Sequence, residues 1–134
     1  MENSKKEILL SVKPQYANLL VDGIKTIELR KKFPMDLENG TKVYVYSSFP
    51  QKMVIGEVLV EKVEKLSIED LWRESATKAM ISWTDFKKYY SSHEEGYAIH
   101  VSSAKRYEKP IMLAEVHSNV TQAPQSYRYL PVSA

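Results

Sequence analysis

No cysteine occurs among the 134 residues of this chain. Disulfide bonds, thiolate metal sites and a thiol nucleophile are therefore excluded. Glycine is scarce, with four residues, and no glycine-rich phosphate-binding loop is present. No apolar run approaches the roughly 20 residues that a membrane-spanning helix needs. Residues 1–6 are polar and lack the apolar core of a signal peptide, so we expect a cytoplasmic protein without a membrane partner.

The charge balance is close to neutral, with a formal net charge of +2 at pH 7. A protein that depends on phosphate contacts alone usually carries more positive charge, but a local basic site is compatible with this total. The three histidines are scattered, and no spacing resembles a metal site. We therefore expect neither a metal ion nor a cofactor.

Apolar patterning predicts a single domain, residues 1–134, with about six short strands and three helices. The expected strands cover residues 8–12, 25–31, 42–47, 53–63, 96–101 and 107–113. The expected helices begin near Pro14, Ser67 and Ser82; Gly23 ends the first, and a loop at 75–81 separates the other two. Because strands follow one another directly, the order favours an α+β fold with a mostly antiparallel sheet that curls into a small barrel.

The segment 23–30 gathers charges of both signs where a helix is expected to end and a strand to begin. Alternation along the strand places Thr26, Glu28 and Arg30 on one face, with Lys25 at the start of the strand. Such a group fits either an exposed strand face with an ion pair or a polar pocket. In a pocket, Glu28 would accept hydrogen bonds from a base or a hydroxyl, and Arg30 would bind a phosphate or carboxylate. A partly desolvated Lys25 could serve as a general base.

The spacing Gly23-x-Lys25-x-x-Glu28-x-Arg30 resembles the signature of the ASCH domain family. The resemblance extends to residues 11–14 and to Gly56 in the strand after residues 46–48, and it covers residues 7–113. It implies a PUA-like β-barrel and a module that binds RNA, a nucleotide or a modified nucleoside, with a role in transcription or translation. The ligand-binding residues implied in this part of the chain are Lys13, Lys25, Glu28, Arg30, Tyr46, Ser47 and Ser48.

Some small proteins of this family are enzymes, so a hydrolase is the alternative. One class hydrolyses N4-acetylcytidine with a lysine, a threonine three residues later and a distant glutamate, and another class cleaves RNA. Lys25 matches the lysine, but Glu28 stands at the threonine position and Thr26 lies one residue after Lys25. These three residues are the catalytic candidates if the protein is an enzyme, with Glu57 or Glu61 as the distant glutamate. Because a carboxylate at position 28 would pair with Lys25 and keep it protonated, we interpret the segment as a binding site before a catalytic one.

The tail, residues 114–134, lacks periodicity, and we expect it to pack on a core formed by residues 7–113. It contains Gln125, Tyr127 and Arg128, which could read a base edge, stack on a base and reach a phosphate. Alternatively, the tyrosines of the tail only dock it on the barrel.

Aromatic residues elsewhere leave two further alternatives. Tyr44 and Tyr46 share one face of their strand and fit either a stacking platform or a half-buried barrel face. The helical region 67–92 could form a surface for an unknown protein partner, but its apolar spacing indicates inward packing. We therefore predict that four of its aromatic residues belong to the core: Trp72, Trp83, Phe86 and Tyr90.

Overall fold

The computed structural model describes residues 6–131, which form a single six-stranded sheet with four helices. In chain order the elements are β1 (Ile8–Val12), α1 (Pro14–Val21), β2 (Ile27–Arg30), β3 (Thr41–Ser47), β4 (Met53–Ser67), α2 (Ile68–Ala79), α3 (Trp83–Tyr89), β5 (Glu95–Ile111), α4 (Leu113–Val116) and β6 (Tyr127–Tyr129). None of the helices in this part of the chain is long and apolar enough to cross a membrane.

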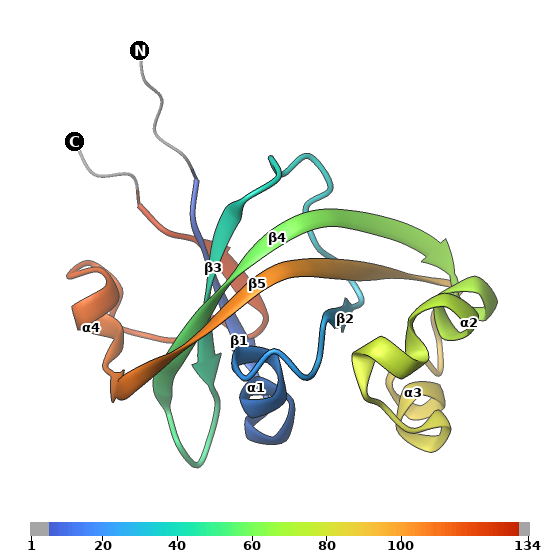
Figure 1. The fold of residues 1–134 in the computed structure, drawn as a ribbon, viewed down its shortest axis with the longest axis horizontal. Helices are drawn as coiled ribbons and strands as arrows, with labels where there is room; N and C mark the ends of the chain where they lie inside the picture. The colour runs from blue at the N-terminus through green and yellow to red at the C-terminus, as the bar shows by residue number, and fades with distance from the viewer. Residues whose placement is uncertain (1–5, 132–134) are drawn as a thin grey trace.

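The strands lie in the order β2-β5-β4-β3-β1-β6, so β2 and β6 form the two edges. β1 and β3 are parallel, and the other neighbouring pairs are antiparallel. The sheet curls into a half-barrel. In the view of Figure 1, α1 lies below the sheet, and α2 and α3 lie to its right. This architecture confirms the predicted α+β, PUA-like fold with a mostly antiparallel sheet.

The long β4–β5 pair differs from its prediction. A single 17-residue strand, β5, replaces the two strands expected at 96–101 and 107–113. The ladder shifts register at three places along the pair, and such bulges let one strand bend without ending. One shift adjoins Gly56, where a Cβ would lie 2.7 Å from Cγ1 of Val21 and closer still to the carbonyl of Lys105. Position 56 therefore requires a residue without a side chain.

Local capping signals determine the helices. Gly23 has a positive φ of 76° directly after the α1 C-cap, as a helix-ending glycine requires. The hydroxyls of Ser67 and Ser82 accept hydrogen bonds from the third residue beyond, at 3.2 and 3.1 Å, and so begin α2 and α3 as predicted. The prediction of a loop at 75–81 is wrong, because α2 continues to Ala79, and its C-cap, Met80, has the left-handed conformation.

The end of the described chain contributes to the sheet. β6 pairs antiparallel with β1, so that Leu10 lies opposite Tyr127 and Ile8 opposite Tyr129. Neither β6 nor α4 was predicted, because three-residue and four-residue elements are too short to show a period. The tail therefore extends the sheet beyond β1.

The core consists of three apolar clusters. The first fills the inside of the curl between the sheet and α1. The second joins β2 and β5 to α2 and α3, and the third lies between β1, β3, β4 and the tail. Phe86 and Tyr90 are buried as predicted, and Trp72 packs against their cluster. The prediction is wrong for Trp83, whose side chain is 49% exposed at the start of α3.

Candidate functional site

The residues of the sequence signature lie together on the inner face of the curled sheet. Strand alternation directs Ile27 and Leu29 toward the second core cluster, and Glu28 and Arg30 toward the opposite face. Lys25 precedes β2 and reaches the same group. We call Lys25, Glu28 and Arg30 the signature cluster.

Lys25 is enclosed by the protein, with 3% of its surface exposed. Its Nζ donates a hydrogen bond of 2.5 Å to the carbonyl oxygen of Ala79, the last residue of α2, and lies 5.1 Å from the centre of the Tyr16 ring. A cation at a helix C-terminus is favoured by the helix dipole. Burial lowers the pKa of Lys25, and the Glu28 carboxylate, 3.5 Å away, opposes that shift.

Glu28 joins the two cations. It is 6% exposed, and its Oε2 accepts a hydrogen bond from Nε of Arg30 at 2.8 Å and forms an ion pair with Nη2 at 2.7 Å. Its other oxygen faces Lys25. One buried carboxylate thus balances two buried or nearly buried cations, an arrangement that is costly to disrupt.

Arg30 connects the two edges of the sheet. It lies at the end of β2, and its Nη2 donates to the carbonyl oxygen of Ser11 in β1 at 2.7 Å. Its Nη1 lies 3.4 Å from Oγ of Ser126, directly before β6. Tyr90 of α3 donates to the carbonyl oxygen of Arg30 at 3.0 Å and so holds the strand from the other side.

The Nη1 end of Arg30 has hydrogen-bonding capacity left. A guanidinium has five N–H donors. Within residues 6–131, Nε and Nη2 donate to Glu28 and Ser11, whereas the two donors of Nη1 have only the long contact with Ser126. The side chain is 11% exposed.

Three chain segments meet near the contacts of Arg30 with Ser11 and Ser126. Because β1 and β3 are parallel, their C-terminal ends lie at the same end of the sheet. The amide of Ser48, after β3, donates to the carbonyl of Val12 at 2.9 Å, and the amide of Ser11 donates to the carbonyl of Ser126 at 2.9 Å. We call residues 11–13, 48–52 and 124–126 the strand-end surface.

The strand-end surface is positively charged. The three stretches that build it, residues 8–21, 39–56 and 116–131, contain no aspartate or glutamate. They contribute the exposed side chains of Lys13 and Lys52, and Arg30 adds its Nη1 end. Lys52 has a positive φ of 56°, a turn conformation that fixes its place at the start of β4. The surface therefore suits an anion, although the whole chain is nearly neutral.

Several predicted ligand-binding residues lie at this surface. Lys13 is the N-cap of α1, Ser48 begins the turn after β3, and Gln125 is exposed beside Ser126. Ser47 is fully buried, and its Oγ has no hydrogen-bond partner among the described residues. Their role in binding stays a prediction.

Other predicted residues have structural contacts instead. Tyr46 is buried in the third cluster, which excludes a stacking platform there. Tyr127 packs against Phe33 with a ring distance of 5.0 Å, a contact that holds the tail against the rest of the protein, and its role in binding stays a prediction. Arg128 Nε donates to the carbonyl of Tyr129 at 3.2 Å.

The remaining catalytic candidates do not form one group. Thr26 takes part in backbone hydrogen bonds with Lys78 and Val101 before β2 begins. Glu57 accepts a hydrogen bond of 2.7 Å from Tyr107 and pairs with Lys42 at 3.5 Å, and Glu61 is exposed.

Sequence analysis missed Lys52 and Ser126. A signal for Lys52 was present in the turn residues before it, and none was present for Ser126, which reaches Arg30 only through the pairing of β6 with β1.

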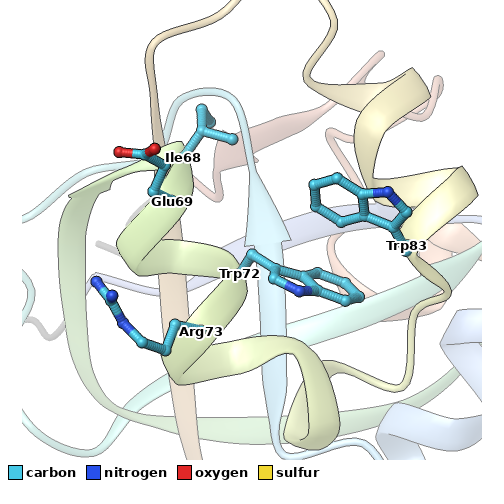
Figure 2. Close-up of a pocket in the computed structure, with 5 residues that line it drawn as sticks. All are labelled: Ile68, Glu69, Trp72, Arg73 and Trp83. Atoms are coloured by element: carbon cyan, nitrogen blue, oxygen red, sulfur yellow. The ribbon is translucent and has the colours of Figure 1, made fainter.

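Two hollows lie away from the signature cluster. One, of about 440 Å³, lies along α2 and α3 and is lined by Trp72 and Trp83, whose rings approach each other as Figure 2 shows. The other, of about 540 Å³, is lined by residues 36–42 with Lys6, Glu7 and Leu59. Neither hollow is lined by a residue of the signature cluster. Among the described residues, no group of three histidine, aspartate or glutamate side chains could hold a metal ion.

A model of the ASCH domain matches residues 10–111. The chain belongs to the ASCH domain family. An ASCH domain-containing ribonuclease of Zymomonas mobilis is 28% identical over 129 residues, which cover 94% of this chain and 85% of the relative. A large ribosomal subunit protein uL22 of Ureaplasma parvum is 30% identical over 130 residues, but these span only 40% of that longer protein.

Solved ASCH structures share the fold. The crystal structure of ASCH from Z. mobilis matches with a TM-score of 0.85 at 28% identity, over 94% of this chain and 88% of the other. Two further crystal structures of that protein, one with a tyrosine replaced by phenylalanine and one with a serine replaced by alanine, also reach 0.85. The predicted family and fold are confirmed.

Proposed function

We propose that this ASCH protein binds single-stranded RNA at the strand-end surface and cleaves it there. The observation that carries the proposal is the Nη1 end of Arg30, which points away from Glu28, contacts Ser126 and has donors to spare beside a surface that bears exposed lysines. A phosphate oxygen is the acceptor that such a guanidinium end and a hydroxyl recognise together. The Z. mobilis ribonuclease, similar over most of both chains, supports RNA as the source of that phosphate.

The same groups suit the chemistry of RNA cleavage. A ribose 2′-hydroxyl or water forms a new bond to phosphorus, and the bond between phosphorus and the leaving ribose oxygen breaks. The proton of the attacking group passes to solvent, and the leaving oxygen takes a proton from solvent. In the five-coordinate state between these events, negative charge collects on the nonbridging oxygens. Cations and hydroxyl donors fixed beside those oxygens stabilise that state more than the ground state. We assign this role to Arg30 and Lys52, and we assign the positioning of the phosphate to Ser126.

The amidohydrolase alternative has less support. Lys25, its proposed base, is enclosed between Ala79, Tyr16 and Glu28, and a substrate would have to displace these contacts to reach Nζ. Glu28 is already engaged with both cations. Incubation with N4-acetylcytidine tests this alternative directly, and release of acetate would restore it.

The test of the proposed function compares Ser126→Ala and Lys52→Asn with the unaltered protein on a fluorescein-labelled single-stranded RNA. Asparagine is chosen at position 52 because it tolerates the left-handed conformation. We expect each change to lower kcat/KM by about tenfold, as the loss of a hydrogen bond to a charged group implies. Exposed residues of β4 and β5, altered as Lys62→Asn and Ser103→Ala, are the matched controls. Equal activity of all variants would refute the site, and inactivity of the unaltered protein on every RNA would refute the function.

A further inference from the structure

Phe49 is the most exposed large apolar side chain of the described chain, at 76%. It lies in the turn between β3 and β4, which Figure 1 shows at the lower end of the sheet near α1. An exposed phenylalanine forgoes roughly 1.5–3 kcal/mol that burial would provide. No core function explains its identity, so its ring is available to a ligand.

The turn holds Phe49 in a defined place. The amide of Ser48 donates to Val12 of β1 at 2.9 Å, and the carbonyl of Ser48 accepts from the amides of Gln51 and Lys52 at 3.1 and 3.5 Å. Phe49 is therefore a corner residue of a hydrogen-bonded turn that is fixed to β1. A ring presented from such a turn loses little freedom when it contacts a ligand.

Phe49 also lies within the strand-end surface. It follows Ser48, which contacts Val12, and the neighbouring Ser11 accepts the hydrogen bond from Arg30. Lys52 is exposed in the same turn, and no acidic residue occurs between residues 39 and 56. The turn that carries the exposed Phe49 and Lys52 is thus attached to β1 one residue from the Ser11 carbonyl that Arg30 contacts.

An aromatic ring beside cations suits single-stranded nucleic acid, because every base offers a face for stacking while its backbone meets the cations. We propose that Phe49 stacks on a base of the single-stranded RNA whose phosphate lies at Arg30 and Ser126. This inference rests on the proposed function and deepens it by making an unpaired base part of the recognised substrate. A duplex keeps its bases stacked on one another and offers none to Phe49.

The test measures binding of a short, fluorescein-labelled 2′-O-methyl oligoadenosine by fluorescence anisotropy; the methyl groups prevent cleavage by the ribose hydroxyl, and gel electrophoresis after the measurement checks that the strand is intact. Phe49→Ala should weaken binding by about 5- to 150-fold, the range of stacking on one base. Phe49→Tyr should bind like the unaltered protein, and Phe49→Leu should resemble Phe49→Ala, because leucine keeps apolar area but not the aromatic face. Since the ring is exposed, all three variants are expected to fold.

Two controls separate stacking from other effects. An oligonucleotide of abasic residues should bind the unaltered protein and Phe49→Ala with equal affinity. Met112, the N-cap residue of α4, is also an exposed apolar residue, and Met112→Ala should bind oligoadenosine with the affinity of the unaltered protein. Unchanged binding by Phe49→Ala, or an equal loss on the abasic strand, would overturn the inference. If Ser126→Ala and Lys52→Asn lose RNA cleavage while Phe49→Ala keeps full affinity, the stacking role fails and the proposed function stands. If the unaltered protein binds no RNA, both fail.

Discussion

Replacement of Glu28 by glutamine should destabilise the fold strongly while changing its shape little. Glutamine has nearly the same volume but no charge, so two cations, at Lys25 and Arg30, would lie in the interior without their shared anion. Removal of one partner from a buried ion pair costs about 3–5 kcal/mol. For a domain of this size that loss lowers Tm by roughly 10–20 °C.

The same variant has a characteristic pH dependence. The folded-state pKa of Lys25 is already lowered by burial, and Glu28 opposes the shift. Without Glu28 that pKa falls further below its unfolded value of about 10.4. Between the two values the unfolded state binds more protons than the folded state, so stability rises with pH. The difference in the free energy of unfolding between the unaltered protein and Glu28→Gln should therefore shrink as pH rises from neutral toward about 10.

Urea denaturation followed by fluorescence of Trp72 and Trp83 and by far-ultraviolet circular dichroism measures both effects. Glu95→Gln is the control, because it breaks an exposed pair with Lys65 and should cost less than about 1 kcal/mol. A loss below about 1 kcal/mol for Glu28→Gln, or a deficit that does not change with pH, would show that the charges of the signature cluster are not balanced as described.

Two further changes test features outside the signature cluster. Tyr107→Phe should reduce the loss of folding stability at alkaline pH. Burial and the hydrogen bond to Glu57 raise the pKa of Tyr107 above its unfolded value of about 10, so the folded state keeps a proton that the unfolded state loses. In the unaltered protein the free energy of unfolding therefore falls by up to about 1.4 kcal/mol per pH unit above that value. Urea curves from about pH 9 to about pH 11 measure this, and an unchanged slope would contradict it. Gly56→Ala should cost about 1–3 kcal/mol at neutral pH, because the new methyl group meets Val21 and the carbonyl of Lys105; a wild-type Tm would show that β4 and β5 can separate there without cost.

The elements with strong local signals were predictable from the sequence. The strand at residues 8–12 agrees with β1, and the serines at 67 and 82 cap their helices. The errors occur where tertiary contacts decide. β5 continues through residues 102–106 because the long ladder with β4 supports it, and β6 forms because β1 offers a free edge.

The candidate site was predictable in part for the same reason. The signature residues were found, because alternation places Glu28 and Arg30 on one face. Their degree of burial was not, because it depends on Ala79 and Ser11, which are distant in sequence. Ser126 could not be found without the pairing of β6, and Phe49 is informative only once its exposure is known.

The contact of residue 11 with the segment 124–126 has a consequence for synthesis of the protein. Ser11 Oγ donates to the carbonyl of Pro124 at 2.7 Å across a separation of 113 residues. During translation the two halves of the strand-end surface leave the ribosome far apart in time, since chains grow at about 5–20 residues per second. Each growing chain therefore lacks the contact between Arg30 and Ser126 until residues 124–126 have left the ribosome.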